Sequence, residues 1–243
     1  MWIRVVNPNT TSEMTATIGR CAAAVAGPGT RLDAVTSSMG PASIESHYDE
    51  ALSVPGILAA IAAGEQAGVD GYVIACFGDP GVEAARELAR GPVVGIAEAA
   101  MRTATQLGRG FSVVTTLSRT IGRAADLVHL HGLQRFCRGI HACDLPVLAL
   151  DDDPRVRKIV TESCRAALAA DDSDAIVLGC AGMADLCASI GAELGVPVVD
   201  GVAAATLAVQ SLLTMDLRPA GRGESASPPP KPYTGLLSPF QLD

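Results

Sequence analysis

The chain contains the same short pattern twice, and this repeat limits the folds that it can adopt. The first copy lies at residues 72–78 (YVIACFG) and the second at residues 176–182 (IVLGCAG). Each copy is a short apolar run that ends in a small residue, a cysteine and, two positions later, a glycine. An alanine-rich stretch follows each copy, and a proline then opens another apolar run, at Pro92 and at Pro197. The sequence therefore predicts two similar halves within one chain.

Apolar, β-branched runs alternate with alanine-rich stretches through most of the chain. This alternation is typical of βαβ units and a mostly parallel sheet. Residues 174–178 (DAIVL) are largely apolar on both faces, as a sheet covered by helices on both sides requires. The predicted strands are 2–6, 31–36, 71–75, 93–96, 111–115, 146–149, 174–178 and 197–199. The predicted helices are 11–25, 51–66, 81–89, 97–107, 118–131, 154–169, 183–194 and 200–214.

The repeat also predicts where the halves begin and end. We expect an N-terminal α/β half at residues 1–97 and a C-terminal α/β half at 98–199. The helix at 200–214 corresponds to the helix at 97–107, because VVDGVA at its start resembles VVGIAE. By this symmetry each of the two helices can cross and pack on the other half. The remaining segment, 216–243, contains SPPP and is predicted to be a flexible or surface-wrapped tail.

The composition argues against several classes of protein. With 243 residues, 49% hydrophobic and 18% charged, the chain is long and apolar enough to bury a core. A net charge of -8 and only 3% aromatic residues argue against nucleic acid or an anionic membrane as a partner. No apolar stretch reaches transmembrane length, and the start, MWIRVV, lacks a signal-peptide pattern. We therefore expect a cytoplasmic protein whose seven cysteines are free thiols.

Cys76 and Cys180 are the strongest candidates for chemistry. Each follows a predicted parallel strand, and ligands of open α/β sheets bind beyond the carboxyl ends of the strands. Backbone N–H groups and a helix N-terminus at such a position are expected to lower the pKa of the thiol. A thiolate formed in this way is a base at neutral pH, and its counterpart, kept as a thiol, is an acid. Such a pair suits removal of a proton from one face of a carbon and its return to the other.

The alternative is that both cysteines are small buried core residues, which is common for free cysteine. Their matching positions in the repeat argue against it. The other five cysteines have no such symmetry and are assigned to structure.

Polar residues lie where the first strand of each half ends. Asn9 follows the first strand, and Thr115 and Thr116 close the corresponding strand of the second half. Such side chains, together with free backbone donors at the start of a helix, offer a cradle for carbonyl oxygens or a carboxylate. Ordinary helix N-capping is the alternative. A turn-rich loop that contains Pro41 and Ile44 lies between a strand and a helix, where it could cover a site.

Other polar clusters are assigned structural roles. Cys137, His141 and Cys143 lack the paired spacing of common zinc sites, so no metal is expected. The acidic run 151–153 before a proline predicts a helix N-cap and first turn. Asp79 belongs to a turn, GDPG, that leads into a helix. The sequence has no Walker loop, dinucleotide-binding fingerprint or HExxH motif.

Four segments taken together resemble the aspartate/glutamate/hydantoin racemase superfamily, and in particular its hydantoin and allantoin racemase branch. These segments are NPNT at 7–10, ACFGDPG at 75–81, VTT at 114–116 and LGCAGM at 178–183. Each segment alone is unspecific, but the combination is specific, and the resemblance extends to about residue 214. It implies two pseudo-symmetric Rossmann-like halves with the site in the cleft between them, and no cofactor.

The resemblance also implies roles for individual residues. Cys76 and Cys180 would be the two catalytic thiols. The candidate substrate-binding residues flank these cysteines, end the neighbouring strands or belong to the loop before the second helix. They are Asn9, Pro41, Ile44, Phe77, Gly78, Thr115, Thr116, Gly179, Ala181 and Gly182.

The residues that follow the cysteines bear on the substrate. Amino-acid racemases of this superfamily usually have Thr or Ser there to hold the α-carboxylate, whereas this chain has Phe77 and Ala181. The departure favours a neutral ring over free aspartate or glutamate. The resemblance therefore implies a racemase of 5-monosubstituted hydantoins, allantoin among them, that removes and returns the C5 proton.

Two other classes of function stay open. One is a relative that acts on dicarboxylates, of the aspartate/glutamate racemase, maleate isomerase or arylmalonate decarboxylase type. The other is a binding or redox protein without catalysis. In each case we expect a small-molecule ligand, no nucleic-acid or membrane partner, and a homo-oligomer.

Overall fold

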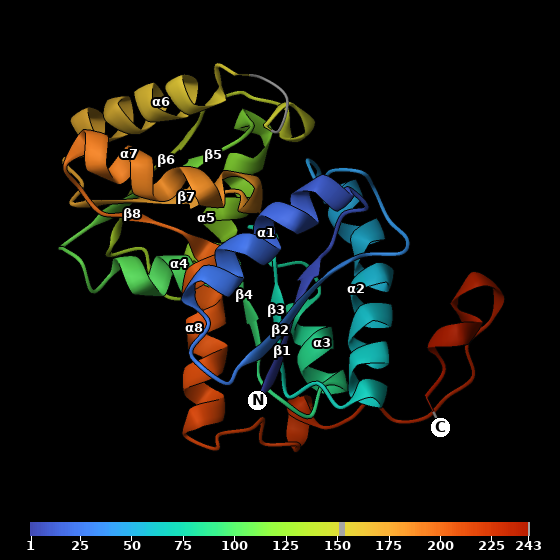
Figure 1. The fold of residues 1–243 in the computed structure, drawn as a ribbon. Helices are drawn as coiled ribbons and strands as arrows, with labels where there is room; N and C mark the ends of the chain where they lie inside the picture. Colours follow the sequence, from blue (N-terminus) through green and yellow to red (C-terminus); the bar gives the residue numbers. More distant parts are fainter. Residues whose placement is uncertain (151–153, 243) are drawn as a thin grey trace.

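The computed structural model describes residues 1–150 and 154–242, which form two sheets of parallel strands (Figure 1). The first sheet has the strand order β2-β1-β3-β4 and the second the order β6-β5-β7-β8. The two orders are the same once the second half is renumbered, so the repeat in the sequence is also a repeat in topology. This is the predicted α/β fold. The strands are β1 (Trp2–Asn7), β2 (Arg31–Thr36), β3 (Gly71–Ile74), β4 (Val93–Gly95), β5 (Phe111–Thr115), β6 (Cys137–Ala142), β7 (Ala175–Gly179) and β8 (Val198–Val199).

Local sequence signals start and stop several helices. Ser46 begins α2 by accepting a hydrogen bond from the Asp49 N–H, and Gly68 ends this helix at a φ of 85°. Asp200 caps α8 by accepting from the Val202 N–H. The α-helices are α1 (Ser12–Val25), α2 (His47–Ala67), α3 (Val82–Leu88), α4 (Ile96–Ala104), α5 (Ile121–Leu130), α6 (Val156–Asp171), α7 (Cys187–Leu194) and α8 (Gly201–Thr214). Short 3-10 helices are η1 (Ser118–Thr120), η2 (Val147–Ala149), η3 (Ala181–Leu186), η4 (Gly223–Ser225) and η5 (Gly235–Phe240).

Helices cover both faces of each sheet, which is why the central strands are apolar throughout. In β3, Val73 packs with residues of α1 and α8, whereas Tyr72 and Ile74 pack with α2 and α3. In β7, Val177 packs with α4 and α5, whereas Ile176 packs with α6 and α7. Every residue of β3, β5 and β7 is buried.

The two halves exchange a helix. α8 follows the last strand of the second half, yet its Val202, Ala205 and Val209 join the core of the first sheet. α4 follows the last strand of the first half, and its Ala97 and Met101 join the core of the second sheet. In Figure 1, α8 runs along the first sheet and α4 lies beside the second. The predicted boundary between residues 97 and 98 falls inside α4, and the division into domains stays a prediction.

One predicted strand is wrong. The sequence predicts a strand at residues 146–149, but 147–149 form the 3-10 helix η2. The edge strand is instead β6, which pairs with β5 in parallel. β6 (CRGIHA) escapes a search for apolar runs, because an edge strand is only partly covered and tolerates polar residues and glycine. Pro146 starts the apolar run that was mistaken for it and lacks the N–H that a central ladder position needs.

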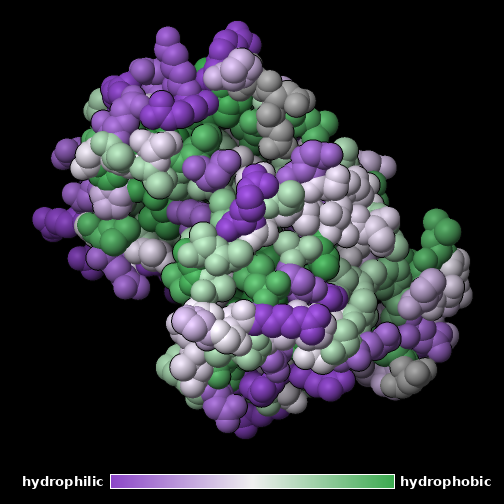
Figure 2. Space-filling model, viewed as in Figure 1, coloured by the Kyte–Doolittle hydropathy of each residue, from purple (hydrophilic) through white to green (hydrophobic). Residues whose placement is uncertain are grey.

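Beyond α8 the described chain passes below the first sheet in the view of Figure 1 and then extends outward on the side of α2. Hydrophobic side chains lie at the tip of this tail (Figure 2), and Leu236 is 96% exposed. No helix in the described part of the chain is long and apolar enough to cross a membrane. The predicted acidic N-cap at 151–153 lies outside the described residues.

Candidate active site

A cavity of about 170 Å³ lies where the carboxyl ends of the two sheets meet. Each sheet changes its winding direction at its first strand, since β2 and β3 lie on opposite sides of β1, and β6 and β7 on opposite sides of β5. Ligand sites in open α/β sheets are usual at such a switch point. The cavity is lined by Asn9, Met14, Ile44, Glu45, Ser46, His47, Glu50, Ala75, Cys76, Phe77, Gly78, Thr115, Thr116, Arg119, Thr120, Arg123, Ala124, Val147, Gly179, Cys180 and Ala181.

Cys76 and Cys180 occupy equivalent places at this cavity. Cys76 comes just after β3 and Cys180 just after β7, the third strand of each sheet in chain order. Both residues line the cavity, and the two thiols are close enough for the charge of one to influence the ionisation of the other. The pseudo-symmetry of the fold therefore presents two thiols to one enclosed volume.

The environment of Cys76 raises the pKa of its thiol to about 12, contrary to the lowered pKa expected from the sequence. Burial is the main cause, and a hydrogen bond from the Gly78 backbone opposes it. The nearby Glu50 and Asp79 disfavour the thiolate further. The expected helix N-terminus is not adjacent, because α3 begins only at Val82. Cys76 is thus a protonated thiol at neutral pH in the free site.

Cys180 follows Gly179 directly and precedes Gly182 by two positions. It precedes η3, and its backbone oxygen accepts a hydrogen bond from Met183. A Cβ at Gly179 would lie 2.9 Å from the Thr115 Cβ, so only glycine lets β7 end this close to β5. A Cβ at Gly182 would lie 3.7 Å from the Cys180 sulfur. The small residues of the repeated pattern therefore bring the second thiol to the cavity.

Asn9 presents hydrogen-bond donors to the cavity. Its Oδ1 accepts from the Thr11 N–H at 3.0 Å and from the Asn7 side chain at 2.8 Å, which fixes the orientation of the amide. Within residues 1–150 and 154–242, the hydrogen-bond partner of the Asn9 Nδ2 is the Met14 sulfur, at 3.1 Å, and a thioether is a weak acceptor. The amide N–H groups can therefore bind a carbonyl oxygen.

Thr115 and Thr116 lie at the matching position in the second half. Both are buried and line the cavity. The Thr115 hydroxyl is within hydrogen-bonding distance of Thr120 and of the Gly179 oxygen, at 3.0 and 3.3 Å. The Thr116 hydroxyl has no hydrogen-bond partner among residues 1–150 and 154–242. Thr116 is thus the freer of the two to bind a ligand.

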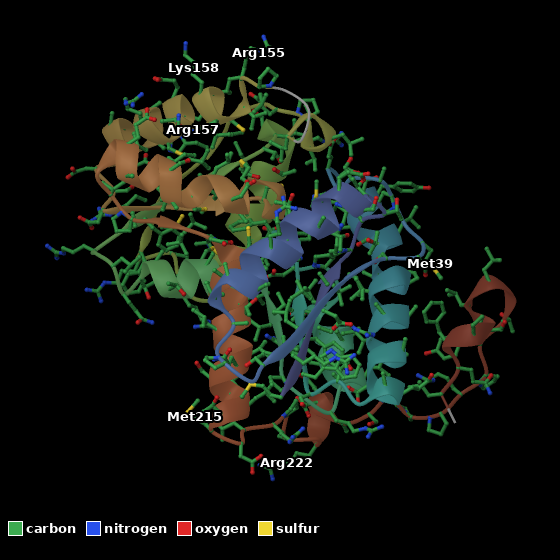
Figure 3. The ribbon with its side chains drawn as sticks, in the orientation of Figure 1. Met39, Arg155, Arg157, Lys158, Met215 and Arg222 are labelled. Atoms are coloured by element: carbon green, nitrogen blue, oxygen red, sulfur yellow. The ribbon has the colours of Figure 1, made fainter. Side chains whose placement is uncertain are left out.

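The loop before α2 closes one side of the cavity. Ile44 and Glu45 line it, and the Glu45 carboxylate accepts a hydrogen bond from the Val147 N–H at 2.8 Å, which ties the loop to the second half. Pro41 does not line the cavity, but its oxygen accepts from the Thr10 N–H at 3.0 Å and so anchors the loop to the start of α1. Met39, at the far end of this loop, is exposed (Figure 3).

The structure brings most of the other predicted residues to the cavity. Phe77, Gly78, Gly179 and Ala181 all line it, whereas Gly182 lies behind Cys180 and does not. Phe77 is also packed into the core beneath the second sheet, so its ring serves both the core and the wall of the site.

Comparison with known proteins shows the family of this chain. The model of the family described as Asp/Glu/Hydantoin racemase matches residues 3–209 of the chain. The chain belongs to the Asp/Glu/hydantoin racemase family. This chain is 50% identical over 214 residues to a hydantoin racemase of Rhizobium meliloti. The match covers 88% of this chain and 89% of that protein.

Solved structures of racemases agree with the family. The allantoin racemase from Klebsiella pneumoniae is 50% identical, with a TM-score of 0.97 and 99% of each chain covered. The allantoin racemase from Pseudomonas fluorescens is 38% identical, with a TM-score of 0.93, and the match covers 97% of this chain and 100% of that chain.

The charged residues of the cavity were not predicted from the sequence, either from the family motifs or from the ends of the predicted strands. Glu50 lies in the first turn of α2 and Arg123 in the first turn of α5, and both line the cavity. Arg123 donates to the Gly78 oxygen through Nη2 at 2.6 Å and through Nε at 3.1 Å. No sequence pattern flagged them, because charged residues in a first helical turn are ordinary at the surface. Only the approach of the two halves makes them part of the site.

The cluster of Cys137, His141 and Cys143, whose spacing is unlike that of common zinc sites, lies outside the cavity lining. Cys137 and His141 lie on β6, away from the cavity, and His141 contacts Asp171 at 2.6 Å. The Cys143 thiol donates to the Thr116 oxygen at 3.6 Å. Among the described residues, no group of three or more His, Cys, Asp or Glu is placed to hold a metal ion.

Proposed function

We propose that this chain racemises 5-monosubstituted hydantoins, allantoin among them, with Cys76 and Cys180 as the two acid/base groups. The observation that carries the proposal is that the two thiols follow equivalent strands of two equivalent sheets and line one cavity. The relatives named hydantoin racemase and allantoin racemase support the substrate class.

The reaction begins with the proton on C5 of the ring. This carbon is next to a carbonyl group, so loss of its proton gives an enolate with the negative charge on oxygen. The Asn9 amide, whose Nδ2 contacts the weak acceptor Met14, and the Thr116 hydroxyl line the cavity and are suited to hold that oxygen. Donors already oriented toward the developing charge stabilise the transition state.

Two proton transfers complete the reaction. One thiolate removes the C5 proton, and the thiol on the opposite face delivers its own proton to C5, so that the roles of the two sulfurs are exchanged. Cys76 is a thiol at neutral pH in the free site, which suits the donor role first. The burial that raises its pKa also makes its thiolate a strong base for the reverse direction. These transfers need no group beyond the two thiols, so no cofactor is proposed.

The test follows optical rotation and deuterium incorporation together. One enantiopure 5-substituted hydantoin is incubated in D2O with the reduced wild-type protein, Cys76→Ala or Cys180→Ala. We expect rotation to decay to zero with deuterium at C5 in the wild type, and racemisation to be lost in each variant. An unchanged rotation without exchange, for both a hydantoin and allantoin, would reject the proposal and favour a dicarboxylate substrate. Release of CO2 without racemisation would favour a decarboxylase.

A further inference from the structure

Glu50 lies directly against the Cys76 loop. It is the fourth residue of α2, and a Cβ at Gly78 would lie only 2.4 Å from its Oε1. Its side chain is 18% exposed and lines the cavity. The charge of Glu50 also acts on the Cys76 thiol. A carboxylate therefore lies beside one of the two proposed catalytic groups.

No described residue donates a hydrogen bond to the Glu50 carboxylate, although two basic side chains lie within ion-pair distance. The basic side-chain atoms near it among the described residues are the Arg123 Nε, at 3.4 Å from Oε1, and the His47 Nδ1, at 3.5 Å from Oε2. These are ion-pair distances, beyond the usual 2.7–3.2 Å range of a protein N–H···O hydrogen bond. Within residues 1–150 and 154–242, no hydrogen bond ends on a Glu50 carboxylate oxygen. Glu50 therefore still needs donors.

The other charged residues of the cavity do not compete for the same ligand groups. Arg123 directs Nη2 and Nε to the Gly78 oxygen. Glu45 is engaged by the Val147 N–H. Arg119 is exposed at the rim. Glu50 is thus the charged group most available to a molecule inside the cavity.

The chemistry of a carboxylate then restricts that molecule. An ionised carboxylate only accepts hydrogen bonds, so a ligand group opposite it must donate. An acidic ligand group would place like charges together in a poorly solvated volume, which is unfavourable. An N–H group would instead form a charge-assisted hydrogen bond.

We propose that Glu50 binds the substrate by accepting hydrogen bonds from N–H groups of its C5 substituent, and so selects donor-bearing substituents against acidic ones. This inference rests on the proposed hydantoin racemase activity and narrows its substrate class to hydantoins with a neutral, N–H-bearing substituent such as an amide or a ureido group.

The test uses two substrates of nearly the same shape. 5-(Carbamoylmethyl)hydantoin and 5-(carboxymethyl)hydantoin differ only in an amide NH2 against a carboxylate oxygen. The ratio of kcat/KM for the amide to kcat/KM for the acid is measured in the wild type and in Glu50→Gln. The ratio does not depend on the folded fraction of a variant, nor on a change in Cys76 reactivity that affects both substrates alike.

We expect the wild type to prefer the amide, and Glu50→Gln to lower the ratio about tenfold or more, the size of one charge-assisted hydrogen bond. Glu162→Gln, at an exposed position of α6 far from the cavity, should leave the ratio unchanged. The role of Glu50 would be overturned by a wild-type preference for the acid, or by a ratio in Glu50→Gln that stays within about twofold of the wild-type ratio. Either result would leave the racemase proposal standing. No racemisation of either compound or of allantoin by the wild type would overturn both.

Discussion

At the scale of single residues, the site depends on small residues beside the two thiols. Gly78 lies against the Glu50 carboxylate, and its oxygen accepts two hydrogen bonds from the Arg123 guanidinium. Its backbone also donates to the Cys76 sulfur, a bond that favours the thiolate. One residue without a side chain thus links the proposed acid/base group Cys76, the proposed recognition group Glu50 and the opposite half of the molecule.

Substitution of Gly78 by alanine should therefore impair both activity and stability. A Cβ would lie 2.4 Å from the Glu50 Oε1, so either the loop or the carboxylate must move. We expect a lower kcat/KM and a loss of about 1–3 kcal/mol in the free energy of unfolding, as for other overpacked sites. Urea denaturation and racemisation assays measure the two effects.

Gly122→Ala is the matched control. Gly122 lies in α5, and a Cβ there would meet no atom within 4 Å. Alanine in an open helical position should raise the free energy of unfolding by about 0.5–1 kcal/mol and preserve activity. Equal effects of the two alanines would contradict the role given to Gly78.

At the scale of elements, the loop after β3 is joined to the helix that follows β4. The Asp79 carboxylate accepts from the N–H groups of Ala97 and Glu98, at 3.0 and 2.9 Å, and so caps α4. A Cβ at Gly95 would lie within 2.2–2.6 Å of this carboxylate, so only glycine permits the contact. The sequence placed Asp79 in a turn, but its partners lie on another element.

The pH dependence of stability tests this cap. Burial raises the pKa of Asp79 to about 7, although the two backbone bonds oppose it. The folded state thus binds this proton more tightly than the unfolded state, where an Asp pKa is about 3.9. Its stabilising contribution is full below about pH 4 and is lost as the pH rises toward 7.

Asp79→Asn should remove this loss of stability at rising pH. Its free energy of unfolding relative to the wild type should rise between pH 4.5 and 8, by at most about 4 kcal/mol. Urea denaturation at several pH values measures the difference, and Asp126→Asn on the exposed side of α5 controls for loss of one surface charge. A difference that does not vary with pH would show that Asp79 is ionised normally in the folded state.

At the scale of the whole molecule, the exchange of α4 and α8 makes the two halves depend on each other. Val209 on α8 is fully buried against the first sheet, and a Cβ at Gly71 would lie 2.7 Å from its Cγ1. α4 and α8 also meet at their starts, since a Cβ at Gly201 would lie 2.8 Å from the Ile96 oxygen. Neither half has a complete core without a helix from the other.

Truncation of one buried side chain of α8 should therefore weaken the entire fold. Val209→Ala is expected to lower the free energy of unfolding by about 2 kcal/mol, with one cooperative transition for both halves. Leu207→Ala on the same helix, at a side chain that is 43% exposed, should cost less than about 1 kcal/mol. Urea denaturation followed by circular dichroism compares them, and two separate transitions would contradict the shared core.

The sequence by itself determined the fold class, most of the elements and the equivalence of the two halves. These features follow from local patterns: apolar runs of strand length, alanine-rich helices, and a repeated small-residue–cysteine pattern. All three can be read from the sequence without a structure. The same patterns identified Cys76, Cys180, Asn9 and Thr116 as residues at strand ends, where parallel sheets place their ligand sites.

Tertiary structure decided what no local pattern records. The polar edge strand β6 is a strand because β5 pairs with it, and the apolar residues 147–149 form a 3-10 helix that carries Val147 to the cavity. Glu50 and Arg123 became part of the site only when the two halves met. The predicted direction of the Cys76 pKa shift was also wrong, since the pKa is raised and not lowered. Desolvation depends on every atom around the sulfur, whereas the sequence shows only its neighbours along the chain.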